Sequence, residues 1–204
     1  LADHLYAPTE HARKILLGEG IAESRVHVTG NTVVDELMRH RDRARQSADL
    51  SRFGVVAGRY ALATVHRAEN VDNDGRLRGI FEGLAAASRA LGLPVLAALH
   101  PRTSKRLAEL GFVVDDAVRT LPPLGYMEFL GLHAEAALVL TDSGGLQEEA
   151  CCLGVPCVTL RDNTERPESV EVGANVLAGA DPAKIVECAR RMRDRARDWP
   201  NPFG

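Results

Sequence analysis

Short, continuously apolar runs alternate along this chain with longer runs whose apolar residues recur every three or four positions. Strands that are apolar throughout are typical of a parallel sheet covered on both faces, because a strand with one wet face alternates apolar and polar residues. Helical runs between such strands are the crossovers that parallel strands require. The pattern therefore predicts an α/β fold with a Rossmann-like, doubly wound parallel sheet.

The individual elements follow from the same pattern. In one helical run Leu77, Ile80 and Leu84 share a face that would cover a sheet. Pro182 directly after Asp181 marks another helix start. The predicted strands are His4–Ala7, Arg25–Val28, Tyr60–Val65, Pro94–Leu99, Val118–Leu121, Ala137–Thr141, Pro156–Leu160 and Asn175–Leu177. The predicted helices are Glu10–Leu17, Thr32–Arg45, Arg76–Leu91, Ser104–Leu110, Tyr126–Ala134, Gly145–Leu153, Arg166–Val172 and Pro182–Arg195.

The sequence predicts a short first part and a larger second part of the chain. A self-contained β–α series begins near Tyr60, whereas residues 1–50 are typical of the end of another series followed by a linker helix. A polar, glycine-punctuated stretch separates the two. The sequence begins without Met and stops after "NPFG", so we expect it to be a piece of a longer polypeptide.

Composition excludes several partners. The 204 residues are 45% hydrophobic and 26% charged, enough for one large α/β domain with pieces of another. A net charge of −3 provides no basic field for nucleic acid. No apolar run approaches the roughly 20 residues of a membrane span or resembles a signal peptide. The four cysteines lack C-x-x-C spacing, so we expect buried thiols in a reducing cytosol.

The predicted strands end in segments rich in His, Arg, Asn and Gly. Ligands of open parallel sheets bind beyond the carboxyl ends of the strands, so these segments are the place to look for a site. They are Thr29–Asn31, His66–Asn70, His100–Arg102, Pro122–Tyr126, Asp142–Gly145 and Arg161–Glu168.

Ser143-Gly144-Gly145 lies where a strand gives way to a helix. Free backbone N–H groups and the helix dipole make such a position an anion site, and glycines let a phosphate approach the backbone. Glu149, one helical turn further along the same face, suits a ribose diol. The alternative is a plain helix cap with a tight turn. We expect Glu148 to face solvent or a helix neighbour.

Two arginines, Arg161 and Arg166, follow the next strand and can hold a diphosphate, or else form surface ion pairs with nearby acids. His66 is the best single candidate for a polar active-site contact, and His100 occupies an equivalent position. Phe129 can wall a base pocket, although a Phe in an amphipathic helix more often belongs to the core. We expect the remaining histidines to be structural or on the surface: His4, His11, His27, His40 and His133.

Several segments together resemble the non-hydrolysing UDP-N-acetylglucosamine 2-epimerases: "VHVTGNTVVDEL", "VHRAENVD", "LHPRT", "TDSGGLQEEACCLGVPCVTLRDNTERPESVEVG" and "NPFG". The resemblance covers essentially the whole chain and about the second half of a typical member. It implies a glycosyltransferase-B-like architecture of two Rossmann-like domains. Residues 1–50 would be the tail of the amino-terminal domain plus the crossover helix, and residues 51–204 the carboxyl-terminal UDP-binding domain.

The family resemblance implies a reversible isomerase reaction. UDP-N-acetylglucosamine loses its C2 proton as UDP leaves, and UDP adds back to the resulting glucal after reprotonation on the other face to give UDP-N-acetylmannosamine. It implies neither metal nor other cofactor, a cytoplasmic homodimer, and a role in cell-envelope polysaccharide biosynthesis. Because the acid and base carboxylates of the family lie mostly in the amino-terminal domain, we expect this chain alone to bind UDP without turnover.

By the same resemblance, His66 is the catalytic histidine, and Arg67 and His100 are candidates for allosteric contacts. The resemblance also makes Ser143, Gly144, Gly145, Glu149 and Arg166 UDP-binding residues. From their positions in the sequence, Phe129, Arg67 and Asn70 are further candidates for substrate or UDP contacts. Ala68 stands where many bacterial members have a second Arg, which resembles a branch acting on UDP-2,3-diacetamido-uronic acid. The same UDP site would also serve a UDP-sugar glycosyltransferase, a hydrolysing relative or a catalytically silent UDP-sugar-binding module.

Overall fold

A computed structural model describes residues 2–204 and confirms the α/β prediction. Its main sheet has six parallel strands in the order β5-β4-β3-β6-β7-β8. The chain builds outward from β3 in one direction, returns to the centre, and builds outward from β6 in the other. The topological switch point therefore lies between β3 and β6. The strands are β3 (Ala61–Thr64), β4 (Val95–Ala98), β5 (Val118–Leu121), β6 (Leu138–Thr141), β7 (Cys157–Thr159) and β8 (Asn175–Leu177).

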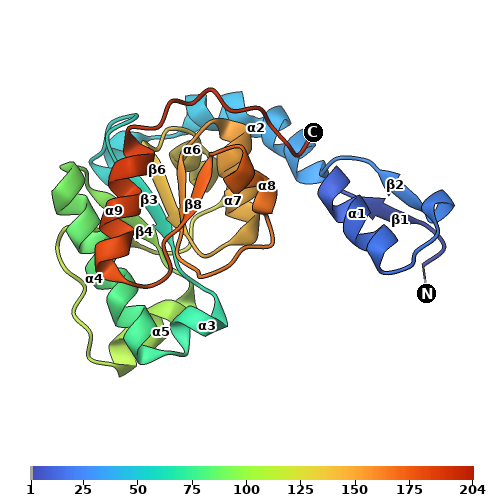
Figure 1. The fold of residues 1–204 in the computed structure, drawn as a ribbon. Coiled ribbons are helices and arrows are strands. Elements are labelled where there is room, and N and C mark those ends of the chain that lie inside the picture. The colour runs from blue at the N-terminus through green and yellow to red at the C-terminus, as the bar shows by residue number, and fades with distance from the viewer. Residues whose placement is uncertain (1) are drawn as a thin grey trace.

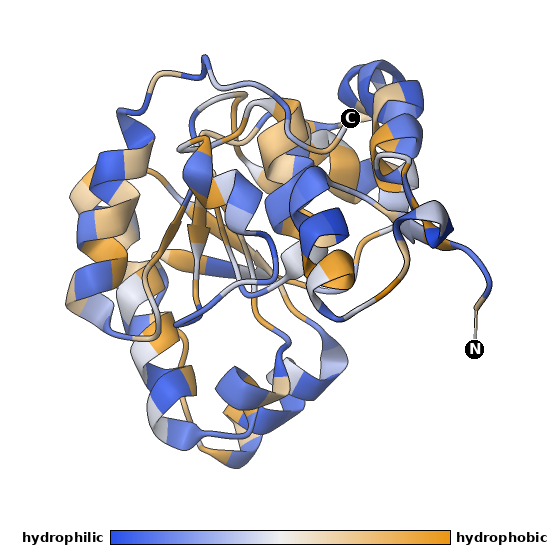
Figure 2. Cartoon of the chain, turned by 45° about the vertical axis from the view of Figure 1, so that its right-hand side comes forward, coloured by the Kyte–Doolittle hydropathy of each residue, from blue (hydrophilic) through white to orange (hydrophobic). Residues whose placement is uncertain are grey.

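Helices cover both faces of this sheet (Figure 1). Ala61 and Ala63 of β3 belong to the apolar cluster under α4 and α9, whereas Leu62 belongs to the cluster on the opposite face. The apolar residues concentrate in the strands and on the inner helix surfaces (Figure 2). The helices of this body are α3 (Ala68–Val71), α4 (Asp74–Leu91), α5 (Pro101–Glu109), α6 (Tyr126–Ala134), α7 (Gly144–Leu153), α8 (Pro167–Glu171) and α9 (Pro182–Arg193).

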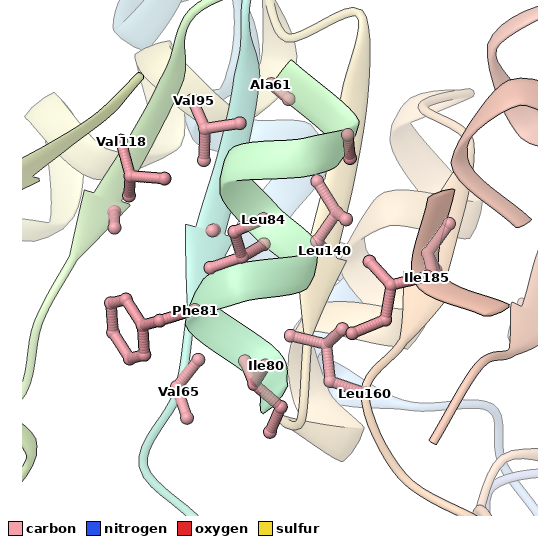
Figure 3. Packing of buried hydrophobic residues seen from close by; sticks show 14 of the residues in the cluster. Ala61, Val65, Ile80, Phe81, Leu84, Val95, Val118, Leu140, Leu160 and Ile185 are labelled. Atoms are coloured by element: carbon pink, nitrogen blue, oxygen red, sulfur yellow. The ribbon is translucent and has the colours of Figure 1, made fainter. Parts of the chain in front are cut away.

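The larger cluster lies between the sheet and the α4–α9 pair, where Leu84 and Ile185 pack over Leu140 (Figure 3). Two glycines of α4 permit the close approach of α9. A Cβ on Gly79 would lie 2.5 Å from the Ala180 carbonyl oxygen, and one on Gly83 would lie 2.7 Å from the end of Ile185. Small residues therefore set the distance between these two helices.

Every predicted strand and helix is present, and the differences are at the ends. Helix α4 starts earlier than predicted because the Asn73 side chain accepts a hydrogen bond from the Arg76 amide (3.0 Å). Helix α5 begins at Pro101 because His100 Nδ1 accepts from the Arg102 amide (3.2 Å). The one-turn helix α3 and the 3₁₀ turns Glu23–Arg25 and Leu50–Phe53 were not predicted.

The first part of the chain forms a separate, two-stranded parallel sheet of β1 (Leu5–Ala7) and β2 (Val26–Val28) with helix α1 (Glu10–Gly18) beside it (Figure 1). Helix α2 (Thr32–Ser47) follows and packs on α6. The division at residue 50 stays a prediction. In residues 2–204, no helix combines the length and the apolar character needed to cross a bilayer.

The last residues return to the start of α2 (Figure 1). Trp199 Nε1 donates to the Cys151 carbonyl (3.0 Å), and Phe203 is buried against Cys151 and Ala174. The Asn31 amide then donates to the Phe203 carbonyl (3.1 Å). The tail thereby fastens α7 to the crossover.

Candidate functional site

Asp142 stands at the carboxyl end of β6, beside the end of β3, and is fully buried. Its carboxylate accepts hydrogen bonds from the His66 amide (3.1 and 3.0 Å), the Arg67 amide (2.9 Å) and Asn70 Nδ2 (3.1 Å). His66 Nδ1 lies 2.8 Å from Asp142 Oδ1. The side chain therefore organises the loop after β3 at the switch point rather than capping α7, which Ser143 does.

This environment keeps Asp142 ionised. Burial alone would raise the pKa of the Asp142 carboxyl, but the hydrogen bonds from His66, the Arg67 amide and Asn70 outweigh it and lower that pKa. With Nδ1 engaged by Asp142, Nε2 of the half-exposed His66 ring is the nitrogen left for a ligand. The pair thus fixes the orientation of the imidazole.

One cavity of about 270 Å³ brings together four of the predicted site residues, namely His66, His100, Phe129 and Ser143. It opens at the ends of β3 and β4 and at the start of α7, as expected for a doubly wound sheet. Phe129 contributes to the apolar side of this cavity, and it also packs against the smaller core cluster. Phe129 therefore borders the cavity and also packs against the core.

The start of α7 is bare. Ser143 Oγ accepts from the Leu146 amide (3.4 Å), while the first N–H groups of a helix have no acceptor within it. A Cβ on Gly145 would meet only Ser143 Oγ, at 4.0 Å, and one on Gly144 would lie 3.4 Å from Glu165 Oε2 and 3.6 Å from Arg67 Nη2. An anion can therefore reach the backbone here, next to the Arg67 guanidinium.

Arg67 is partly exposed and Asn70 is buried. Arg67 Nε donates to the Asp142 carbonyl (3.3 Å), its Nη1 lies 3.9 Å from Glu165 Oε1, and its side chain is 39% exposed. Asn70 is fully buried, donates to Asp142 and to the Leu160 carbonyl (2.9 Å), and accepts from Arg76 Nε (3.0 Å). Contrary to expectation, the Asn70 amide is thus occupied by protein groups and has no free surface for a ligand.

The loop after β7 contributes a buried arginine, Arg161, to an ion-pair cluster whose two carboxylates are about half exposed. Arg161 donates to Glu69 Oε1 (2.6 Å) and to Glu165 Oε2 (2.7 Å). The hydrogen bond from Arg161 lowers the pKa of Glu165 to about 2. For Arg161 the ion-pair prediction is therefore correct, because both carboxylates already engage its guanidinium.

Arg166 lies on another side of the same loop. Its Nε is 2.7 Å from Glu148 Oε1, and Asn31 Nδ2 donates to the same oxygen (3.0 Å). Glu148 is 3% exposed, so the expectation of a solvated Glu148 is wrong: the loop and the start of α2 cover it. Arg166 borders a separate cavity of about 280 Å³ that reaches Thr9 of the first segment.

Glu149 faces a third hollow, of about 620 Å³, which it shares with Tyr126 and the first turns of α2. Its Oε2 lies 3.5 Å from Nδ1 of the buried His133. The structure therefore places Glu149 on the side of α7 away from Arg166, and its hollow is distinct from the cavity that contains His66.

Sequence reasoning placed Asp142 and Tyr126 in segments after the strands but gave neither a role in the site, and it expected Glu148 to face solvent or a helix neighbour. Asp142 carried a signal, since an acid directly after a buried strand occupies the same edge of the sheet as His66. Tyr126 carried a weaker one, an aromatic at the start of a helix. The environment of Glu148 depends on segments distant in sequence, and no local pattern indicates it.

Comparisons with known proteins extend over the whole chain. A family model described as UDP-N-acetylglucosamine 2-epimerase matches residues 1–204. UDP-N-acetylglucosamine 2-epimerase of Methanocaldococcus jannaschii is 45% identical over 211 residues, covering 100% of this chain and 58% of the relative. UDP-2,3-diacetamido-2,3-dideoxy-D-glucuronate 2-epimerase of Pseudomonas aeruginosa is 40% identical over 193 residues, covering 93% and 52%.

The solved structures agree. A crystal structure of the M. jannaschii UDP-GlcNAc 2-epimerase in complex with UDP-GlcNAc and UDP superimposes with a TM-score of 0.92 at 46% identity. It covers 100% of this chain and 57% of the solved chain. This chain thus spans little more than half the length of these relatives.

Proposed function

Since this chain belongs to the UDP-N-acetylglucosamine 2-epimerase family, we propose that it is the carboxyl-terminal, UDP-binding half of an enzyme that epimerises UDP-N-acetylglucosamine at C2. The observation that carries this proposal is the bare start of α7 beside the Asp142–His66 pair at the switch point. One group there binds an anion and the other can supply a proton, which is what departure of a nucleoside diphosphate requires.

The proposed binding roles belong to residues of α7 and of the segments around it. Gly144 and Gly145 direct N–H groups at the diphosphate, the Ser143 hydroxyl donates to it because the Ser143 amide is taken by Thr141 Oγ1 (3.0 Å), and Arg67 adds charge beside them. Glu149 accepts hydrogen bonds from the ribose hydroxyls in its hollow. Phe129 provides an apolar wall. Arg166 is held by Glu148, and we propose that its remaining N–H groups contact the nucleotide.

The chemistry of the proposed reaction is elimination and re-addition. A base removes the C2 proton, the C2–H electrons form the C1=C2 double bond, and the C1–O bond breaks toward UDP. His66, supported by the Asp142 carboxylate, donates from Nε2 to the departing phosphate oxygen. The N–H groups of α7 stabilise the charge of the leaving UDP. A proton then returns to C2 on the opposite face, and UDP adds back at C1. We place the base that acts at C2 outside this chain.

We further propose that Arg67 and His100 take part in regulation by a second nucleotide sugar and that Asn70 acts through Asp142. Free cysteines, three of them buried, support a cytoplasmic location. The homodimer and the role in cell-envelope polysaccharide biosynthesis rest on family resemblance. Sedimentation of the full-length protein tests the dimer.

A second substrate is favoured by one comparison. The relative from P. aeruginosa is named for UDP-2,3-diacetamido-2,3-dideoxy-D-glucuronate, and Ala68 in this chain departs from the second Arg of many bacterial members. UDP-2,3-diacetamido-uronic acid is therefore the second substrate that the experiment must include.

The deciding experiment incubates the full-length protein with UDP-N-acetylglucosamine in deuterated water and follows the C2 hydrogen by proton NMR. We expect its signal to disappear as a manno product forms. Exchange only with the diacetamido-uronic acid nucleotide would move the enzyme to that branch. UDP binding without exchange on either substrate would contradict the epimerase and leave a binding module or a glycosyltransferase. The 204-residue chain alone should bind UDP without exchange.

A further inference from the structure

A buried imidazole with no hydrogen bonds lies behind the proposed ribose ligand. His133, in the last turn of α6, is 0% exposed, and neither Nδ1 nor Nε2 has a hydrogen-bond partner in residues 2–204. A buried polar group without a partner is costly, and an aliphatic side chain would fill the same space without that cost. A polar residue at this position therefore suggests that it acts on a neighbour.

The nearest acidic group is Glu149. His133 Nδ1 lies 3.5 Å from Glu149 Oε2, beyond hydrogen-bond length but within reach of a small rotation of the carboxylate. The ring of Phe129 also lies near the imidazole, with its centroid 6.0 Å away and its plane at 63° to it. Phe129 restrains the plane of the imidazole, and Glu149 offers the acceptor.

On its other side Glu149 opens on the hollow with Tyr126, and its side chain is 20% exposed. A carboxylate between a buried donor and a solvent-filled hollow has one oxygen for each. Its rotamer then depends on what lies behind it. An ordered second neighbour is the usual way in which a protein fixes a binding side chain.

We propose that His133 is a positioning residue for Glu149: its Nδ1–H takes one carboxylate oxygen and turns the other toward the two ribose hydroxyls of the nucleotide. This inference rests on the proposed function, because it names the part of UDP that the pair reads. His133 itself does not touch the ligand. It restricts the Glu149 side chain in the unbound protein, so less side-chain entropy is lost when the diol binds.

The test compares His133→Met, which keeps volume and burial but removes the donor, with His133→Asn, which returns an N–H near the position of Nδ1. Calorimetry on the full-length protein measures Kd for UDP and for 2′-deoxy-UDP, which lacks one of the hydroxyls. We expect His133→Met to weaken UDP about 5- to 10-fold and to weaken 2′-deoxy-UDP, which keeps one of the two hydroxyls, clearly less. His133→Asn should recover most of the preference for UDP.

The controls separate positioning from packing. In a Glu149→Gln background, His133→Met should have almost no further effect on UDP. An equal loss for both nucleotides, or an unchanged Kd for UDP, would overturn the proposal. If the Met variant does not fold, the Asn variant decides: a retained preference for UDP supports the proposal and a lost one overturns it. A wild-type protein that fails to bind UDP contradicts the proposed function itself.

Discussion

Two carboxylates at opposite ends of the "DSGGLQEE" segment show how differently one protein can use the same chemical group. Asp142 is fully buried and accepts hydrogen bonds from both backbone and side-chain donors. Glu149 faces a hollow of about 620 Å³, and its carboxylate lies 3.5 Å from His133 Nδ1. The first carboxylate has all its acceptor capacity satisfied by the protein, whereas the second keeps it for something else.

The comparison teaches where binding capacity remains. At the switch point the protein uses Asp142 to fix His66, so the half-exposed imidazole rather than the carboxylate borders the cavity. On α7 the carboxylate itself is presented. Rigidity at one site and availability at the other are both visible in the hydrogen bonds, before any ligand is considered.

The largest expected effect is at Asp142. Asp142→Asn replaces one acceptor oxygen by an NH₂ group that faces donors, and it removes the charge on which they converge. We expect the free energy of unfolding to fall by about 2–4 kcal/mol, measured by urea denaturation at neutral pH. Asp162→Asn is the matched control, because Asp162 is 73% exposed and should cost less than about 1 kcal/mol. Equal effects of the two changes would show that the buried network is not special.

Glu149→Gln should leave stability almost unchanged and weaken UDP binding. We expect stability within about 0.5 kcal/mol of wild type, because no hydrogen bond of the fold depends on this side chain within residues 2–204. The Kd for UDP should rise about 10- to 30-fold, since a charge-assisted hydrogen bond to the ribose is lost. Calorimetry and thermal denaturation on the same samples measure both. A large loss of stability with unchanged UDP binding would reverse the contrast between the two carboxylates.

The smallest effect concerns acid stability. Arg161 lowers the pKa of Glu165 to about 2 from its ordinary 4.5, so Glu165 stabilises the fold fully above about pH 4.5. Its contribution is lost as the pH falls from there toward 2, because the unfolded chain takes up the proton first. Glu165 is 48% exposed, and we expect a contribution below about 1 kcal/mol.

Glu165→Gln should therefore flatten the acid limb of the stability curve, measured by urea denaturation at a series of pH values. Glu171→Gln, at an exposed position on α8, is the control and should leave that limb in place. A Glu165→Gln curve that falls as steeply as wild type between pH 4.5 and 2 would assign the acid sensitivity to other groups, Asp142 first among them, since its pKa is also lowered.

The fold was predictable because its signals are local. Runs such as Ala137–Thr141 are apolar throughout and short, which favours a buried parallel strand. Asn73 and His100 cap helices that begin before their first apolar residue, so the predicted starts were late. The single turn of α3 is too short for a periodic pattern to appear.

The site was predictable only where the topology places residues. His66 and Ser143 meet because both follow neighbouring strands of one sheet. The neighbours Glu148 and Glu149 look alike in sequence, yet one is covered by the loop after β7 and the other opens on α2. Which side is covered depends on long-range packing, which the local sequence does not contain. The same holds for Asn70, whose polar character indicated a ligand contact although its amide bonds to the protein.

The hydrogen bond between the Asn31 amide and the Phe203 carbonyl joins the beginning and the end of the larger body. Residues 31 and 203 therefore lie side by side, although the first segment also contacts the body through Thr9 and Glu168 (2.5 Å). A new peptide link between residues 31 and 203 would be short, and openings made in surface loops elsewhere should give circular permutants with the same sheet. Because its two ends are adjacent, residues 31–203 should also tolerate insertion into a loop of another protein.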